Sequence, residues 1–553
     1  MDNSNSKEFV GKLINFLEYN DIKTIFSYPG EQILPFYRAI ENSNINLINV
    51  KHEQAAAHMA DGYARITNET GVCLVTAGPG ATNITTGVAT AFRDNSSIVC
   101  FTGRCSSKYI GTEFFQEIPM DFLDFEEGSY IFESNDENLN TVKNVFEKSF
   151  FNRKPIQINI SKNVYNSLDK SSSLLKITKN YKSYEKYINN HNNSELCNNI
   201  HATYQINNMN NTKNSKNLEI NEYFETLKNN EIVQNSKNPI LLIGQGIFGQ
   251  LNYSEILQIN NMLKNSKIPI VTTYPARGII SEEDEKCLGM IGRRGYFANE
   301  HLKNCDLIIN LGSSLSYNTI LESWDDIKSK IVDLNVNINN ISDIELIVRN
   351  INDIFEKCDI FKKYNKIYRN NNHSLNKIVK FGDYSKKVKE LIESIPNDSI
   401  IVTDAGNHTV FTSLFKTCML PKSIISSHSM GTMGFGLPCA IGVKYGCIDK
   451  SIDREVININ GDGGIQMNIQ ELATVAKNNL KMLIIIMKNS RLNIFCDLDN
   501  PNYVKLGEAY GITSKLVKSE NEIKKCVNEY LEGNGPLILV IECEDESLPK
   551  PEN

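Results

Sequence analysis

Short apolar runs recur along this chain, separated by polar or helical segments. The first 165 residues contain TIFSYPG, INLINV, VCLVTAG, SIVCFTG and PIQINIS, and the last third contains SIIVTD, EVININ, MLIIIM and LILVIE. Runs of this length are typical of buried strands, and strands that alternate with helices form parallel sheets with helices on both faces. The sequence therefore predicts an α/β fold of doubly wound parallel sheets.

The 553 residues are enough for roughly three or four domains. We expect a first domain over residues 1–165, a middle domain over 238–360 and a third domain over 385–553. The segments between them, 166–237 and 361–384, are rich in Asn, Lys and Ser, so they bury too little apolar surface to offset chain entropy. We interpret the first as a long, partly disordered, Asn-rich linker and the second as a short linker.

The third domain contains a pattern that predicts a metal site. Asp462 follows an apolar run within Gly461-Asp462-Gly463, and Asn489 follows the next apolar run, one strand–helix–strand crossover later. Mg²⁺ prefers oxygen ligands of this kind and retains phosphate and water as further ligands. The glycines allow the backbone to approach a ligand, and the helix that follows offers free N–H groups to phosphate oxygens. The alternative is an ordinary turn between a strand and a helix, with no ligand.

This block resembles the diphosphate-binding motif of thiamine diphosphate-dependent enzymes, in which Gly-Asp-Gly is followed at this spacing by Asn. Two further blocks resemble the family in the family's order: VKHEQAAAHMADGYARITNETGVCLVTAGPGATN over 50–83, and SSHSMGTMGFGLPCAIGVKYG over 426–446. The segments YPGEQILPFY, AFRDNSSIVCFTGR and IGTEFFQEI are similar to the catalytic subunit of acetolactate synthase (acetohydroxyacid synthase). The resemblance implies a pyrimidine-binding first domain, a Rossmann-like middle domain and a diphosphate-binding third domain.

The resemblance also implies a set of cofactor-binding residues. Asp462 and Asn489 would bind Mg²⁺ through their side chains, and Arg491 would bind it through its backbone carbonyl. The other residues implied to hold the cofactor are Pro29, Gly30, Glu53, Asn83, Asn407, His408, Gly431, Met433, Gly461, Gly463, Gly464 and Ile494.

Four residues are expected to be catalytic on the same resemblance. Glu53 would contact the pyrimidine ring and relay a proton at N1′, and the alternative is a solvated Glu at a helix start. Phe115 and Gln116 would face the thiazolium ring from the neighbouring subunit. Lys162 matches a family lysine by position, and the alternative is a surface lysine after a strand.

The implied activity is that of a thiamine diphosphate- and Mg²⁺-dependent enzyme of branched-chain amino acid biosynthesis. It would decarboxylate a 2-oxo acid such as pyruvate and join the enamine that remains to a second carbonyl compound. Two alternatives stay open: a simple 2-oxo acid decarboxylase or a carboligase with another acceptor, and a non-catalytic relative that binds the cofactor.

The chain departs from acetolactate synthases at the acceptor pocket. Asn318 stands where the family has an Arg that holds the acceptor's carboxylate, and an amide cannot replace that charge-assisted pair. Leu498 stands near the place of a family Trp, whereas the single Trp of this chain is Trp324. Arg293 and Arg294 stand where relatives have Met and His, and one of them is a candidate for the missing contact.

The middle domain opens with NPILLIGQGIFGQ, a strand followed by Gly244, Gly246 and Gly249, which is typical of a Rossmann-like unit. Acetolactate synthases bind FAD in this domain. The later strand, KIVDLNVNINNI, lacks the Asp-rich turn of FAD-binding members, so FAD is a doubtful cofactor here.

Composition limits the other partners. A net charge of −7 argues against a nucleic-acid partner, and no apolar run approaches the roughly 20 residues of a membrane span. The N-terminus lacks a signal-peptide pattern and the 13 Cys form no Cys-x-x-Cys pair, so we expect a cytoplasmic protein without structural zinc. The resemblance implies a homodimer or homotetramer with its active site at the subunit interface, and it leaves a regulatory subunit open.

Overall fold

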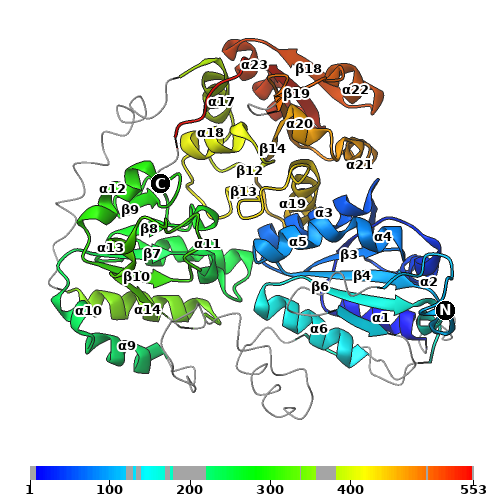
Figure 1. The fold of residues 1–553 in the computed structure, drawn as a ribbon, viewed down its shortest axis with the longest axis horizontal. Coiled ribbons are helices and arrows are strands. Elements are labelled where there is room, and N and C mark those ends of the chain that lie inside the picture. Colours follow the sequence, from blue (N-terminus) through cyan, green and yellow to red (C-terminus); the bar gives the residue numbers. More distant parts are fainter. Residues whose placement is uncertain are drawn as a thin grey trace.

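Residues 8–119, 129–132, 139–168, 175–177, 220–334, 336, 338–356, 381–492 and 496–550 are described by a computed structural model. Within these ranges the chain forms three α/β domains, each built on a parallel sheet (Figure 1). The predicted fold class is therefore confirmed. No described helix is both long and apolar enough to cross a membrane.

The first domain, called the N-domain below, has six parallel strands in the order β2-β1-β3-β4-β6-β5. Along β3, Val72 and Leu74 pack into one apolar cluster and Cys73 and Val75 into another, so the sheet is buried on both faces. The strands are β1 (Thr24–Ser27), β2 (Asn46–Asn49), β3 (Gly71–Val75), β4 (Ile98–Arg104), β5 (Ser129–Phe132) and β6 (Ile156–Ser161). The helices are α1 (Phe9–Tyr19), α2 (Leu34–Ile40), α3 (Glu53–Thr67), α4 (Pro79–Asn83), α5 (Thr85–Arg93), α6 (Leu139–Asn152) and α7 (Lys162–Tyr165).

The middle domain has five parallel strands in the order β11-β10-β7-β8-β9. Its strands are β7 (Pro239–Ile243), β8 (Ile270–Thr272), β9 (Cys287–Met290), β10 (Leu307–Leu311) and β11 (Ile331–Asp333). Its helices are α9 (Ile220–Lys228), α10 (Glu231–Asn235), α11 (Tyr253–Leu263), α12 (Tyr296–Asn304), α13 (Asp325–Lys328) and α14 (Ile341–Ile354). Phe224 of α9 and Val233 of α10 are buried in the core of this domain, although both helices fall inside the stretch 166–237 that the sequence predicts as a linker.

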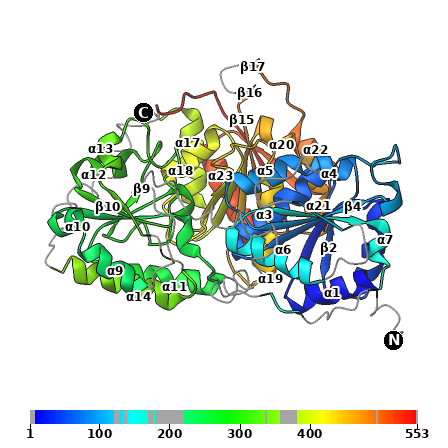
Figure 2. The same ribbon diagram turned by 60° about the horizontal axis from the view of Figure 1, so that its bottom comes forward.

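The third domain, called the C-domain, repeats the strand order of the N-domain as β13-β12-β14-β15-β19-β18. Its strands are β12 (Ile400–Thr403), β13 (Ile424–Ser426), β14 (Val456–Gly461), β15 (Leu483–Lys488), β18 (Thr513–Val517) and β19 (Leu537–Glu542). Its helices are α17 (Asp383–Ser394), α18 (Asn407–Phe415), α19 (Gly436–Asp449), α20 (Asp462–Ile465), α21 (Leu472–Lys477), α22 (Tyr503–Ala509) and α23 (Glu520–Glu532). A short antiparallel hairpin, β16 (Arg491–Leu492) and β17 (Cys496–Asp497), projects beyond β15 (Figure 2).

Helices α3 and α19 join the N-domain to the C-domain, and they lie between the two sheets (Figure 1). The helices cross closely because glycine stands at each contact. A Cβ added to Gly62 would lie 2.2 Å from the carbonyl oxygen of Cys439, and one added to Gly442 would lie 1.9 Å from that of Met59. One continuous apolar core therefore spans both domains.

Replacing Gly442 by Ala is expected to destabilise the chain by about 1–3 kcal/mol, because the added methyl group must push α3 away from α19. Gly533→Ala is the control, since a Cβ there would come no closer than 3.2 Å to another atom. Thermal unfolding of the two variants measures the difference. Equal melting temperatures would contradict the close packing.

Candidate active site

The C-domain sheet has a switch point between β12 and β14, where the strand order reverses. In α/β sheets such a point opens a crevice at the carboxyl ends of the strands, and ligands bind there. Asp404 follows β12 and Asp462 follows β14, while Ile459 of β14 pairs with Thr403 of β12. Two carboxylates therefore stand at the crevice that the topology creates.

The carboxylate of Asp462 is held beside the end of β15. Its Oδ2 accepts hydrogen bonds from the backbone N–H of Ser490 and from Nδ2 of Asn500, both at 2.7 Å. The hydroxyl of Tyr503 donates to the backbone carbonyl of Asp462, also at 2.7 Å. Burial raises the pKa of Asp462, and the hydrogen bonds from Asn500 and Ser490 act in the opposite direction. Asp462 and the segment that begins with Asn489 thus lie together, as the sequence predicts.

The Asn489 amide is oriented by its neighbours. Its Nδ2 donates to Oδ1 of Asp545 at 3.1 Å, and its Oδ1 accepts from the backbone N–H of Arg491 at 3.3 Å. Arg491 begins β16, so the hairpin leaves the sheet directly from this point. Ile494, which the sequence places among the cofactor residues, lies outside the described residues.

The glycines of the motif make room between segments that are far apart in sequence. A Cβ on Gly463 would lie 3.4 Å from Cε of Met433, and one on Gly464 would lie 2.8 Å from Oδ2 of Asp404. A Cβ on Gly461 would lie 3.4 Å from the His408 ring. The structure therefore brings the segments around residues 404–408, 431–436 and 461–464 to one edge of the sheet.

Asp404 is a residue of this site that the sequence analysis did not single out. Its carboxylate accepts the backbone N–H of Gly434 at 3.0 and 3.1 Å and that of Ala405 at 2.6 Å. It therefore fixes the loop that carries Met433. Burial raises the pKa of Asp404 to about 7. An acidic side chain directly after an apolar strand was the available signal, but nothing in the sequence shows that the loop of Gly434 folds back onto it.

Asp404 gives a pH-dependent prediction. Its pKa rises from 3.8 to about 7 on folding, so the folded chain retains a proton that the unfolded chain releases. The contribution of Asp404 to the free energy of unfolding of the cofactor-free protein should be largest below about pH 4. It should fall as the pH rises towards 7. Asp404→Asn cannot ionise and should lose less stability over that range. Chemical unfolding across the range measures both proteins, and parallel profiles would contradict the assignment.

His408 is buried at the same edge, and Asn407 is beside it. Burial lowers the pKa of His408 to about 4, so the ring is neutral. The Asn407 amide donates to the carbonyl of Glu546 at 3.4 Å. Both residues are among those that the resemblance implies to hold the cofactor, and the buried His408 ring lies next to Gly461.

Glu53 begins α3 and is almost fully buried. Its Oε2 accepts a hydrogen bond from Nδ2 of Asn83 at 2.9 Å, and a Cβ on Gly80 would lie 3.7 Å from its Oε1. The backbone N–H groups of Lys51 and His52 donate to Oε1 of Glu471, at 2.8 and 3.1 Å. Glu471 of the C-domain therefore fixes the turn that positions Glu53.

The N-domain sheet reverses its order between β1 and β3, so it also has a crevice at its carboxyl ends. Pro29 and Gly30 follow β1, and Thr76 follows β3. A Cβ on Gly30 would lie 2.3 Å from Cβ of Thr76, so this loop requires glycine. The predicted residues Pro29, Gly30, Glu53 and Asn83 all belong to this end of the N-domain.

The other three predicted catalytic residues are more exposed. The Phe115 side chain is 68% exposed, and Gln116 has a positive φ of 66° and packs against Gly78. Lys162 forms a surface ion pair with Glu31 at 2.8 Å. Their catalytic roles remain predictions.

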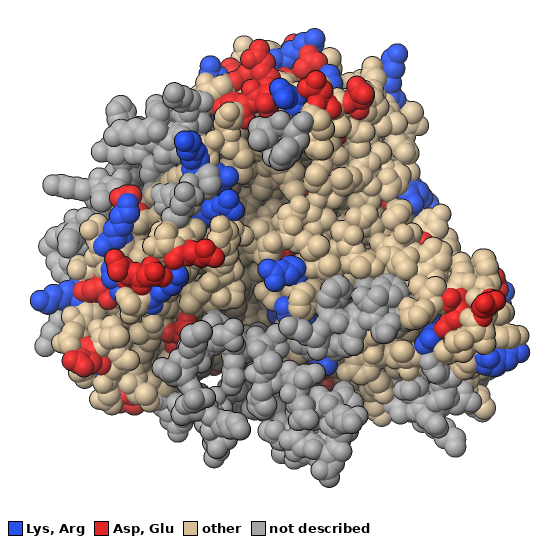
Figure 3. All heavy atoms as spheres, viewed as in Figure 1, with Lys and Arg blue, Asp and Glu red and all other residues tan. Residues whose placement is uncertain are grey.

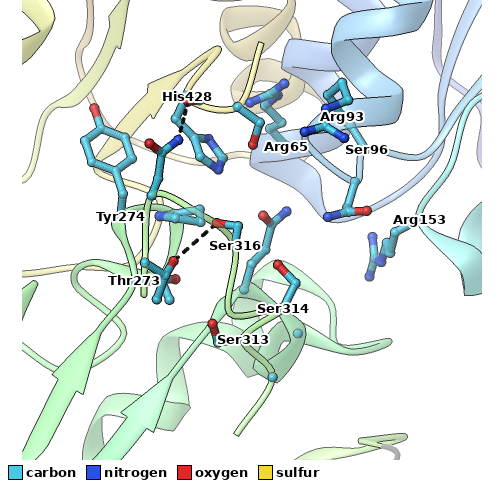
Figure 4. A pocket seen from close by; sticks show the side chains of 18 of the residues that line it. Arg65, Arg93, Ser96, Arg153, Thr273, Tyr274, Ser313, Ser314, Ser316 and His428 are labelled. Carbon is cyan, nitrogen blue, oxygen red and sulfur yellow. Dashed lines mark hydrogen bonds between the residues drawn. The ribbon is translucent and has the colours of Figure 1, made fainter. Parts of the chain in front are cut away.

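A cavity of about 860 Å³ lies where the three domains meet. Figure 3 shows this face hollowed between the domains, with basic side chains nearby. The cavity reaches the predicted cofactor loops at Asp404, Gly406 and Gly431. Figure 4 shows Arg65, Arg93 and Arg153 of the N-domain facing Ser313, Ser314 and Ser316 of the middle domain, with His428 of the C-domain between them.

The glycines of the middle domain serve packing. Gly246 donates its N–H to the carbonyl of Gly312 at 2.7 Å, and a Cβ on Gly244 would lie 2.3 Å from the same oxygen. Gly249 abuts the carbonyl of Ile338, at 2.4 Å from an added Cβ. The turn after β7 is a short 3-10 segment, and α11 begins only at Tyr253. These contacts explain the glycines without a nucleotide.

Comparison with known proteins identifies all three domains. The chain matches the N-terminal TPP binding domain of thiamine pyrophosphate enzymes over residues 9–125, their central domain over 228–356 and their C-terminal TPP binding domain over 404–541. An uncharacterized protein of Methanocaldococcus jannaschii is 46% identical, covering 98% of this chain and 99% of its own length. Probable acetolactate synthase large subunits of Methanococcus aeolicus and M. jannaschii are 31% and 30% identical. They cover 95% and 97% of this chain and 90% and 92% of their own lengths.

Proposed function

Because the chain belongs to the thiamine pyrophosphate enzyme family, we propose that it is an acetolactate synthase-like enzyme that acts on a 2-oxo acid. It would bind thiamine diphosphate through Mg²⁺, decarboxylate the 2-oxo acid and join the remaining unit to a second carbonyl compound. The main support is the Asp462 carboxylate, which is held beside Asn489 at the C-domain switch point, with Met433 against Gly463. The homologues named acetolactate synthase support the same assignment.

The donor set fits Mg²⁺. Asp462 offers a carboxylate whose burial raises its pKa, and a bound cation would offset that desolvation. Asn489 offers an amide oxygen and Arg491 a backbone carbonyl. Both hydrogen bonds from Ser490 and Asn500 reach Oδ2 of Asp462, so we propose Oδ1 as the oxygen that faces the cation.

The bound cofactor would supply an electron sink for the carbanion that decarboxylation leaves. In this chain Met433, which packs against Gly463, would contact the bound cofactor. Glu53 would hold and release a proton at the pyrimidine ring, and Asn83 keeps its carboxylate in place. Asp404 would maintain the Met433 loop through the N–H of Gly434.

We propose a homodimer, or a homotetramer built from it, with the active site between two chains. Within the described residues, no hydrogen bond or ion pair joins Glu53 to Asp462 or Asn489. Several large apolar side chains of the N-domain and the C-domain are exposed, as expected where a second copy of the chain covers them. They are Phe114 (37%), Phe115 (68%), Met430 (43%) and Met467 (51%). Sedimentation equilibrium tests this, and a monomer that retains turnover would contradict it.

The decisive experiment incubates pure protein with thiamine diphosphate, Mg²⁺ and pyruvate, and measures CO₂ and acetolactate separately. CO₂ and acetolactate are expected in equal amounts, because each condensation follows one decarboxylation. CO₂ without acetolactate would support the second candidate, a decarboxylase or a carboligase with another acceptor. Asn318 and Leu498 favour that candidate, because they occupy the places of the family's acceptor-pocket Arg and Trp.

FAD is a possible but doubtful ligand of the cavity between the domains. The size of the cavity and the position of Asp333 at the end of β11 support a large ligand. Against FAD, Gly244 and Gly246 are occupied in packing against Gly312. We therefore expect purified protein to show no visible flavin absorbance, and a tightly bound yellow chromophore would contradict that expectation.

A further inference from the structure

The cavity between the domains has a strong excess of positive charge. Among its lining residues only Asp333 and Asp404 are acidic. The basic ones are Arg65, Arg93, Arg153, Lys154, Arg293, Arg294 and Lys422. An excess of this kind in a hollow of about 860 Å³ favours an anionic ligand.

Most of these basic groups already have structural partners. Arg65 pairs with Asp61 and Asp94, at 2.7 and 2.9 Å. Four others donate to backbone carbonyls: Arg153 to Asn68, Lys154 to Phe92, Arg294 to Pro549 and Lys422 to Arg65. Arg93, which ends α5 and is exposed, has no such side-chain partner among the described residues. The five groups with such partners are poorly placed to change them.

Arg293 differs from these five groups. In the described part of the chain, no acidic side chain pairs with its guanidinium group, which lies over the ring of Tyr317 at 5.7 Å from the centroid. The residue is exposed and lines the cavity. A guanidinium on an aromatic face retains its N–H donors for a planar anion such as a carboxylate.

Two hydrogen bonds through Asn318 connect Arg293 to the loop that carries Gly431 and Met433. Its N–H donates to the carbonyl of Asn318 at 3.0 Å, and Nδ2 of Asn318 donates to the carbonyl of His428 at 3.2 Å. His428 belongs to the same loop as Gly431 and Met433. Arg293 therefore stands where the middle domain meets the loop proposed to support the cofactor.

We propose that Arg293 binds an anionic group that the acceptor retains throughout the reaction, such as the carboxylate of a second 2-oxo acid. This inference rests on the proposed function. The donor's carboxylate leaves as CO₂. A cation bound to this carboxylate would stabilise the substrate before decarboxylation and so slow the reaction. The donor's carbonyl carbon then bonds to the acceptor's carbonyl carbon, a proton goes to the acceptor's oxygen, and the acceptor's anionic group is unchanged. A fixed cation suits that group.

Arg294 provides a matched control. It is the next residue, it lines the same cavity, and its Nη1 donates to the carbonyl of Pro549 at 2.6 Å and to the hydroxyl of Tyr296 at 3.0 Å. Arg293→Met and Arg294→Met remove the same charge from the same loop. Only the first removes a guanidinium that has no side-chain hydrogen bond among the described residues.

The test supplies the full-length enzyme, Mg²⁺ and thiamine diphosphate with pyruvate as donor and equal concentrations of 2-oxobutanoate and propanal as acceptors. The ratio of charged to neutral condensation product is independent of how much enzyme is active. We expect Arg293→Met to lower this ratio by about tenfold or more, since a charge-assisted hydrogen bond is lost. Arg294→Met should leave the ratio near that of the wild type, and Arg293→Lys should restore part of it.

An unchanged ratio in Arg293→Met would overturn the proposal, as would a wild type that releases CO₂ but condenses neither acceptor. Titration calorimetry of 2-oxobutanoate separates this result from a failure of the proposed function. Wild type should bind at least about tenfold more tightly than Arg293→Met, even if pyruvate yields no CO₂. Equal affinities, or no binding by wild type, would also overturn the proposal.

Discussion

Replacing Glu53 by Gln is expected to lower turnover by about 10²–10⁴-fold while thiamine diphosphate still binds. Gln retains the size of Glu and can still accept the hydrogen bond from Asn83, so the start of α3 should be unchanged. What it loses is the ability to hold and release a proton at the pyrimidine ring. Steady-state kinetics with pyruvate measures the loss, and titration calorimetry measures cofactor affinity.

The control for this experiment is Glu300→Gln. Glu300 is exposed on α12 and pairs only with Lys303 among the described residues, so its loss should leave turnover within about twofold. If Glu53→Gln retained wild-type turnover, Glu53 would have only a structural role at the helix start. A loss of cofactor affinity that equals the loss of turnover would point to binding rather than proton relay.

Replacing Asp462 by Asn should weaken Mg²⁺-dependent binding of thiamine diphosphate by about 100-fold or more. Loss of an outer-shell partner commonly costs 10–100-fold in metal affinity, and a direct ligand should cost at least as much. Asn can still accept the bonds from Ser490 and Asn500, so the fold at the end of β14 should survive. Calorimetric titration with thiamine diphosphate at fixed Mg²⁺ gives the affinity.

Chelation provides an independent comparison for this variant. Wild-type protein treated with EDTA should bind the cofactor as weakly as Asp462→Asn does, and added Mg²⁺ should restore only the wild type. Asp325→Asn is the matched control, because Asp325 is exposed and pairs with Lys328 on the surface. Cofactor binding by Asp462→Asn that is unaffected by chelator would show that Asp462 is not a metal ligand.

The predicted metal residues come together because of local rules. Gly461 of β14 pairs with Met487 of β15, and Asp462 and Asn489 follow within two residues of those positions. Parallel strands joined by a crossover have their carboxyl ends at one edge of the sheet. The proximity of residues that follow such strands can therefore be predicted from the sequence. The family's three domains are also readable from sequence, and the comparisons confirm them.

Other contacts of the site could not be predicted from the sequence. The importance of Asp404 depends on the N–H of Gly434, which the fold supplies from another loop. Glu471 reaches the turn before Glu53 from a different domain. Arg293 and Arg294 are neighbours in sequence, and only their contacts distinguish them: Arg294 donates to Pro549 and Tyr296, whereas Arg293 lies over the ring of Tyr317.

The sequence by itself determined the α/β class, the family and the strand ends that carry Asp462 and Asn489, because hydrophobic periodicity and short crossovers are local properties. Only the tertiary structure decided which carboxylate fixes the Met433 loop, which of the two arginines has hydrogen-bond partners and why Gly442 must lack a side chain. Those outcomes depend on distances between segments that are not neighbours in sequence, such as Asp404 with Gly434 and Gly442 with Met59. Packing of buried surface sets these distances, and no local pattern encodes them.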